Sequence, residues 1–188
     1  AVLRNLVHGG VENRPRVIVA PIRSLLQPQV KGLADLEPVH VKTGQDVELD
    51  TLIQGLADAA YHRVDLVTNR GEFAVRGGIV DVFAPTDDHP VRIEFWGDTV
   101  DEIRYFSVAD QRTIEVVDEM TAPGCRELLL TDEVRAKAER YAQSHPSLSE
   151  LFTKIANGHA VEGMESLAPV LAGEMELLID LLPEGSVV

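Results

Sequence analysis

The sequence predicts an α+β protein in which a helix packs against an antiparallel sheet. Three observations carry this prediction. Four β-rich runs follow one another at 71–77, 78–85, 90–97 and 100–108, with turn-forming residues between them. An amphipathic helical pattern precedes these runs, and helical patterns follow them. Strands with such short connections pair as antiparallel hairpins, so we expect one sheet in the middle of the chain.

The first block, residues 1–35, has the pattern of a small α/β layer. "AVLRNLV" resembles the end of a helix that Gly9 and Gly10 stop. "RVIVAP" at 16–21 predicts a short buried strand, and "IRSLLQ" at 22–27 predicts a helical turn. One strand and one helix do not make a domain, so this block needs a partner.

The second block, residues 36–123, contains the predicted sheet and the helix that packs on it. "EPVHVKTG" predicts a strand, and residues 45–63 predict an amphipathic helix with Asp46 as its candidate N-cap. The connectors "TDDH" and "GD" are turn signals that separate the later strands.

The third block, residues 124–188, is mainly helical in pattern. "DEVRAKAERYAQ" predicts a helix with Thr131 or Asp132 as the cap, and a second helix is expected to end near Gly158. "GMESLAPVL" favours a weaker helical segment. "MELLIDLLPEGSVV" has the pattern of a strand, a turn and the start of a new strand at "SVV".

Composition limits the class of function. The 188 residues include 17 Lys and Arg against 31 Asp and Glu, a net charge of −14. This charge disfavours the phosphate backbone of nucleic acid as a partner for the chain as a whole. One cysteine, Cys125, cannot form an internal disulfide and fits a reducing cytoplasm. We expect no membrane partner, because no apolar run reaches transmembrane length. The chain does not begin with Met, which suggests a piece of a longer protein.

Residue patterns that carry catalysis are missing from the sequence. It contains neither a phosphate-binding loop nor a dinucleotide fingerprint, and no zinc-protease or nucleophile-elbow motif. The six histidines lack metal-ligand spacing. We therefore predict no catalytic residue, no metal and no cofactor for this chain.

The informative feature is the outward face of the sheet at "PVRIEFWGD", residues 90–98. Alternation along a strand puts Val91, Ile93 and Phe95 on the core face and leaves Trp96 with Arg92 on the other. Trp and Arg are enriched at binding hot spots. Alternation alone leaves another interpretation open, in which the tryptophan packs against the helix or another block as part of a scaffold.

The run "GEFAVRGGIVDVFAPTDDHPVRIEFWGDTVDEIRYFSVADQRT" resembles the excinuclease-B-homology module of bacterial transcription-repair coupling factors (Mfd). The resemblance rests on the glycine turn "GEFAVRG", the "DVF" strand, the "RIEFW" strand and the "ADQRT" end of this run. "RVIVAPIRSLLQP" is similar to the preceding segment of that module, and the residues after 124 are similar more loosely.

The resemblance implies a domain arrangement and a binding site. Residues 1–35 and 124–188 would be parts of a split α/β domain pair, 1A and 1B, with domain 2 inserted between them at 36–123. Domain 2 would dock the damage-recognition ATPase UvrA. The residues that would contact UvrA are the following: Arg76, Arg92 and Trp96, with Glu94 and Phe73 beside them.

The resemblance also implies what lies outside this chain. The parent would be an ATP-dependent DNA translocase of the bacterial cytoplasm, acting in transcription-coupled nucleotide excision repair. Its other domains would bind ATP, DNA and RNA polymerase, and a C-terminal domain would mask the UvrA-binding surface.

Four functions stay open on the sequence. The leading one is a UvrA-binding module. The others are a nucleic-acid-binding module, in the form of a UvrB-like helicase fragment that contacts UvrA and damaged DNA, an ATPase, and a purely structural scaffold. The leading hypothesis predicts that Arg92→Ala or Trp96→Ala each costs ~2–4 kcal/mol of binding while the fold survives.

Overall fold

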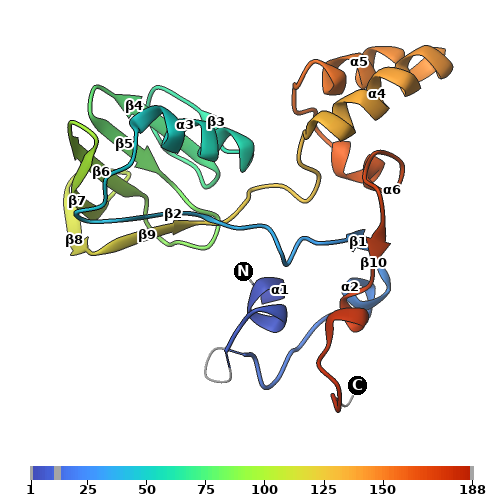
Figure 1. Ribbon diagram of the computed structural model, residues 1–188, viewed down its shortest axis with the longest axis horizontal. Coiled ribbons are helices and arrows are strands. Elements are labelled where there is room, and N and C mark those ends of the chain that lie inside the picture. Colours follow the sequence, from blue (N-terminus) through green and yellow to red (C-terminus); the bar gives the residue numbers. More distant parts are fainter. Residues whose placement is uncertain (1, 11–13, 187–188) are drawn as a thin grey trace. The chain divides into compact units, whose positions relative to one another are not determined.

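The computed structural model describes residues 2–10 and 14–186 (Figure 1), and the chain divides into two units. We call Glu37–Cys125 the strand unit. The helical unit combines Ala1–Leu36 with Arg126–Val188, so the first and last blocks of the sequence belong together. The assignment of these segments to domains 1A, 2 and 1B stays a prediction.

A six-stranded sheet in the order β3-β4-β5-β6-β7-β8 forms most of the strand unit. Its neighbours pair antiparallel, except β3, which runs parallel to β4. This arrangement confirms the predicted α+β class and the four predicted strands. The sheet strands are β3 (His62–Arg63), β4 (Glu72–Arg76), β5 (Ile79–Val82), β6 (Val91–Trp96), β7 (Thr99–Phe106) and β8 (Thr113–Val117).

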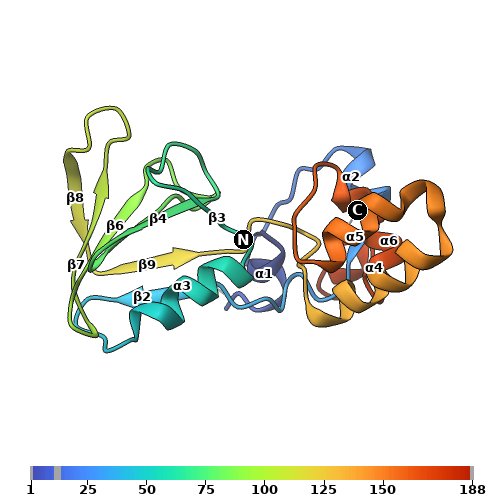
Figure 2. The same cartoon turned by 90° about the horizontal axis from the view of Figure 1, so that it is seen from above.

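One face of the sheet is covered by the helix α3 (Leu49–Asp58) and by a two-stranded ribbon of β2 (Val39–Lys42) and β9 (Glu119–Ala122). Figure 2 shows α3 lying beside β2. Leu52 and Leu56 of α3 pack with inward side chains such as Val80 and Ile93, which are inaccessible to solvent. Burial of these aliphatic side chains, at ~1.5–3 kcal/mol each, is the main force that holds α3 to the sheet.

The start of α3 differs from the prediction. Asp46 is not its N-cap: the residue before the helix is Glu48, whose side chain makes no capping bond. Asp46 instead accepts a hydrogen bond of 2.6 Å from the Thr99 hydroxyl at the start of β7. Asp46 and Thr99 also form an isolated β-bridge. This pairing of two distant segments gives the carboxylate of Asp46 a hydrogen-bond donor, so the side chain does not cap the helix.

The helical unit has its own core of Leu128, Phe152, Ile155, Met164 and Leu171 among others. The predicted helices after residue 131 are present. The elements of this unit are the α-helices α1 (Val2–Val7), α2 (Ile22–Leu26), α4 (Asp132–Ser144), α5 (Ser149–Ala156) and α6 (Ala168–Leu171), the 3₁₀ turns η1 (Pro146–Leu148), η2 (Met164–Leu167) and η3 (Leu178–Leu181), and the strands β1 (Gln29–Val30) and β10 (Met175–Glu176).

The predicted buried strand at 16–21 is wrong. This segment is not a strand, and Val17 and Val19 are 81% and 94% exposed. An extended run becomes a strand only beside a neighbour that pairs with its backbone, and no described strand pairs with residues 16–21.

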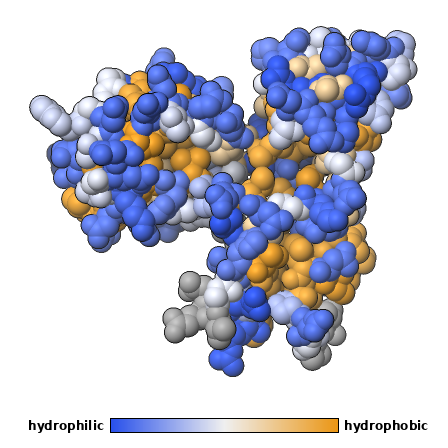
Figure 3. All heavy atoms as spheres, in the orientation of Figure 1, coloured by the Kyte–Doolittle hydropathy of each residue, from blue (hydrophilic) through white to orange (hydrophobic). Residues whose placement is uncertain are grey.

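Figure 3 shows apolar surface gathered at the end of the helical unit that holds α2.

The strand start expected at "SVV" is not borne out at Ser186, which is not in a strand. The rest of that prediction, at 187–188, lies outside the described residues.

Thr131 caps α4 through its hydroxyl, which accepts a hydrogen bond of 3.3 Å from the amide of Val134. Thr131→Ala should lower the free energy of unfolding of the helical unit by about 1 kcal/mol, because a helix N–H loses its acceptor. Urea unfolding followed by circular dichroism measures this. Thr153→Ala, at an exposed position inside α5, is the matched control. Equal midpoints for both variants would show that the cap contributes nothing.

A candidate partner-binding face

The face of the sheet opposite α3 carries a row of paired charges. Pairing of β5 with β6 places Asp81 opposite Arg92, and pairing of β6 with β7 places Arg92 opposite Arg104. Side chains at directly opposed positions lie on the same face of a sheet. The row therefore joins three neighbouring strands and holds one carboxylate and two guanidinium groups.

Asp81 is the centre of this row and is only 1% exposed. Its carboxylate accepts three hydrogen bonds. Arg92 donates from Nε to Oδ1 at 2.7 Å and from Nη2 to Oδ2 at 2.8 Å, and Arg76 donates from Nη2 to Oδ2 at 2.6 Å. The fork of Arg92 thus grips both oxygens, the strongest geometry for an arginine–carboxylate pair.

Three groups fix the guanidinium of Arg92. Besides Asp81, the side-chain carbonyl of Gln111 accepts from Nη2 at 2.9 Å, and the ring of Phe106 lies 4.4 Å from the guanidinium carbon. The hydrogen bond to Asp81 is the main cause that raises the pKa of Arg92 above its usual value. Arg92 therefore carries its positive charge at neutral pH.

Arg104 continues the row on β7 and pairs with two carboxylates, Glu94 on β6 and Glu102 on its own strand. The hydrogen bond to Glu94 is the largest of the causes that raise the pKa of Arg104. Its side chain is 17% exposed. The side chains of Arg104 and Glu94 are therefore hydrogen-bonded to each other, which leaves fewer of their donor and acceptor atoms available to a partner.

Trp96 ends β6 and is 83% exposed. An irregularity in the pairing of β6 with β7 between Glu94 and Phe95 precedes it, and Gly97, with a φ of 63°, turns the chain directly after it. The positive φ suits glycine, which lacks a Cβ. The interpretation in which Trp96 packs under the helix is therefore wrong.

The structure places four of the five predicted site residues on this face, in three groups. Arg76 and Arg92 meet at Asp81, Glu94 lies next along β6 and binds Arg104, and Trp96 is exposed at the strand end. Phe73 does not belong to this face. It is 1% exposed in the core beneath the sheet, because its position on β4 alternates with that of the outward Arg76, and a partner cannot reach it.

Sequence reasoning missed Asp81, Gln111 and Arg104. The signal for Asp81 was a single acidic residue inside the apolar run "GIVDVF", since a charge in the middle of a central strand needs a partner. Gln111 lies in the "ADQRT" stretch, which was noted only as part of the resemblance. Its contact with Arg92 joins residues 19 positions apart in the chain, so no local pattern reveals it.

Glu72 at the start of β4 holds the preceding loop in place. Its carboxylate accepts hydrogen bonds of 2.8 Å from the amides of Thr68 and Asn69. Burial acts to raise the pKa of Glu72, but hydrogen bonds from Asn69 and Thr68 outweigh it, so the pKa is lowered from its ordinary 4.5.

A lowered carboxylate pKa in the folded state makes folding favour the ionised form. The contribution of Glu72 to stability is therefore present above about pH 4.5 and is lost as the pH falls through the lower, folded pKa. Glu72→Gln should be less stable than wild type at pH 7, and the difference should shrink below pH 4.5 in urea unfolding. A pH-independent difference between Glu72→Gln and wild type would contradict the assignment.

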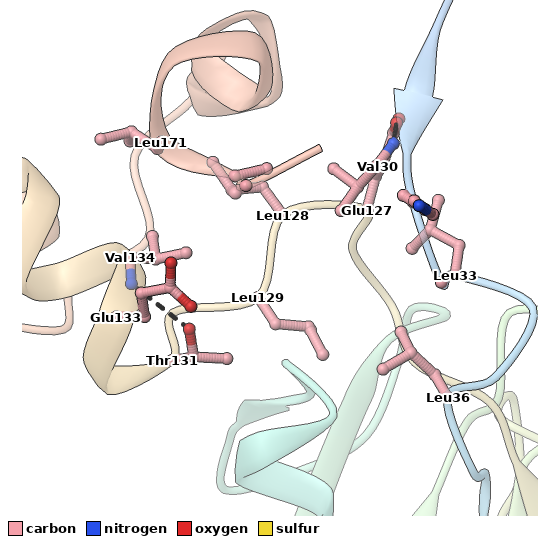
Figure 4. Close-up of a pocket in the computed structure, with 14 residues that line it drawn as sticks. Val30, Leu33, Leu36, Glu127, Leu128, Leu129, Thr131, Glu133, Val134 and Leu171 are labelled. Atoms are coloured by element: carbon pink, nitrogen blue, oxygen red, sulfur yellow. Dashed lines mark hydrogen bonds between the residues drawn. The ribbon is translucent and has the colours of Figure 1, made fainter. Parts of the chain in front are cut away.

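Figure 4 shows a hollow within the helical unit. Its volume is about 170 Å³, and its lining includes Val30, Leu33, Leu128 and Leu171. This volume is below the ~300–1,000 Å³ of typical small-molecule sites.

Among residues 2–10 and 14–186, no group of His, Cys, Asp and Glu has the arrangement of a metal site. No helix in these ranges is long and apolar enough to cross a membrane.

The sequence of the strand unit matches a known protein family. Residues 39–126 match the family described as the UvrB interaction domain. Over 181 residues, 90% of this chain, the sequence is 49% identical to the transcription-repair-coupling factor of Mycobacterium tuberculosis. The chain belongs to the transcription-repair-coupling factor family. A member of this family from Myxococcus xanthus is 35% identical over 198 residues, 97% of this chain.

The chain spans 15% and 16% of the length of these two coupling factors. The match to the UvrB interaction domain at residues 39–126 coincides closely with the strand unit, Glu37–Cys125. The Bacillus subtilis coupling factor is 36% identical over 124 residues, 65% of this chain and 10% of that protein. All three relatives are coupling factors, which favours the leading interpretation over the alternative of a UvrB helicase fragment.

Proposed function

We propose that the strand unit binds UvrA through the face that carries Trp96, Arg76 and Arg92. One observation supports this most directly: the largest apolar side chain of the protein is 83% exposed on the same sheet face as an arginine pair that a buried carboxylate holds. Burying a tryptophan against a partner releases a large apolar area from water, and it costs little conformational entropy because the side chain has few rotatable bonds.

The two arginines would contribute differently. The side chain of Arg76 is 45% exposed and gives Asp81 only Nη2, so Nε and Nη1 point to no described acceptor. The side chain of Arg92 is 14% exposed and already spends Nε and Nη2 on Asp81 and Gln111. Arg76 would therefore meet a carboxylate or carbonyl of UvrA directly, while Arg92 mainly supports the surface.

For the longer protein we propose the activity that the resemblance implies. It would be a bacterial cytoplasmic, ATP-dependent DNA translocase that brings UvrA to RNA polymerase stalled at lesions, with its motor and its polymerase-binding domain outside this chain. A C-terminal domain of the parent would mask the UvrA-binding face. This chain alone would hydrolyse no ATP and hold no cofactor.

A titration decides between the candidate functions. The 188-residue chain is mixed with the UvrA of the same bacterium in a calorimeter, and separately with double-stranded DNA and with ATP. Saturable binding to UvrA alone supports the proposal. Binding to DNA with a steep salt dependence would favour a nucleic-acid module instead, and no binding to UvrA would refute the proposal.

A further inference from the structure

Asp81 and Gln111 are absent from the predicted binding residues, yet they make the contacts that orient the arginines. Asp81 lies on β5 between the two strands that carry Arg76 and Arg92, and it is almost completely buried. Both of its oxygens accept from Arg92, and one also accepts from Arg76. A buried carboxylate gripped on two sides has no freedom to reorient, so it sets the direction of both guanidinium groups.

Gln111 holds Arg92 from the other side. Its carbonyl oxygen accepts from Nη2, and its amide group donates to the backbone carbonyl of Val108 at 3.2 Å. The backbone of Gln111 has a φ of 61°, in the left-handed region that glycine prefers. A glutamine persists in such a conformation when its surroundings impose it, and here the backbone bond to Ser107 and the contact with Arg92 do so.

We infer that Asp81 and Gln111 are positioning residues of the partner-binding face, which fix the arginines before the partner arrives. This inference rests on the proposed function. A free arginine side chain loses rotational freedom when it binds, and this loss weakens the complex. Arg92 has lost that freedom in the folded chain, and Arg76 has lost much of it. The face therefore presents its free donors in one arrangement on the side of the sheet that carries Trp96, which gives affinity without any contact between Asp81 or Gln111 and UvrA.

Two variants separate positioning from folding. Asp81→Asn keeps the shape of the side chain, but its NH2 group cannot accept from an arginine. Gln111→Gly removes the side chain, and glycine takes the φ of 61° without steric cost, so this variant places no new strain on the fold. The control is Ile93→Val, which shortens a fully buried core side chain on β6 without touching the outward face and lowers stability mildly.

The first measurement needs no partner. Nuclear magnetic resonance of the arginine side chains in the 188-residue chain reports whether each Nε–H is held in one hydrogen bond. We expect the Arg92 Nε–H signal of the wild type to be shifted and protected from exchange with water. It should lose both properties in Asp81→Asn, because Nε–H donates to Asp81. Gln111→Gly removes an acceptor of Nη2, so it should speed the exchange of the Nη protons of Arg92, while Ile93→Val leaves both signals unchanged. A wild-type signal that exchanges like that of a free arginine would overturn the inference.

The second measurement is the titration with UvrA. We expect Asp81→Asn to bind about tenfold more weakly than wild type and Gln111→Gly about threefold to tenfold more weakly. Ile93→Val should bind as wild type does. Loss of affinity in Gln111→Gly with unchanged stability supports positioning, whereas wild-type affinity in both variants refutes it. If wild type itself does not bind UvrA, the proposed function fails, and the resonance measurement still decides how the arginines are held.

Discussion

Replacing Trp96 with alanine is expected to weaken binding to UvrA by ~2–4 kcal/mol, which is about 30-fold to 1,000-fold in Kd. The side chain is 83% exposed in the free chain, so the variant removes apolar area that only a partner can bury. The free energy of unfolding should change by less than about 0.5 kcal/mol, because an exposed side chain supports little of the fold. Calorimetric titration gives the first quantity and urea unfolding gives the second.

Leu66→Ala is the matched control for this prediction. Leu66 is 47% exposed in the strand unit and lies in the loop before β4, so it loses a comparable kind of side chain away from the proposed contact residues. An equal loss of affinity in both variants would mean that the effect is general and not specific to Trp96. Trp96 is the chain's only tryptophan, so quenching of its fluorescence by acrylamide, with and without UvrA, gives an independent measure of its burial in the complex.

Replacing Arg92 with alanine is expected to destabilise the strand unit by ~3–5 kcal/mol. Asp81 would lose two of its three hydrogen bonds while its carboxylate stays buried. A buried charge left with an incomplete set of partners is costly, and this cost is larger than the net value of the intact pair. Urea unfolding measures the loss.

This result would differ from the sequence-based expectation that the fold survives Arg92→Ala unharmed. Arg76→Ala is the contrasting variant. Its side chain is 45% exposed, and removing it leaves the bidentate bond between Arg92 and Asp81 intact, so a loss of only about 1 kcal/mol is expected. If both variants unfold at the same urea concentration, the buried carboxylate does not depend on Arg92 in the way its hydrogen bonds indicate.

A double variant isolates the cause. Asp81→Leu together with Arg92→Met replaces the ion pair by apolar side chains of similar size. It should recover most of the stability that Arg92→Ala loses, since a buried pair and an apolar substitute are often of equal stability. Failure of the double variant to recover would assign the loss to the stem of Arg92 and its packing on Phe106. Binding measured on Arg92→Ala must therefore be corrected for the unfolded fraction.

The central strands could be predicted because their signals are local. "VRIEFW" alternates core and outward residues along one strand, and Gly97 stands where the chain must turn with a positive φ. The segment at 16–21 has equally strong β-forming residues, yet it is not a strand, because a strand also needs a pairing neighbour that the local sequence does not specify. Asp46 failed as a cap for a related reason, since Thr99 lies far along the chain and satisfies its carboxylate.

The sequence by itself determined the α+β class, the four central strands and the side of β6 on which Trp96 lies, because these depend on alternation and on turns between neighbouring residues. Only the tertiary structure decided that Trp96 is exposed, that Arg92 is mostly occupied by Asp81 and Gln111, and that Phe73 belongs to the core. These facts depend on strand register, which brings Arg92 to a residue 11 positions away and to another 19 positions away. Register is set by the packing of the whole sheet on α3.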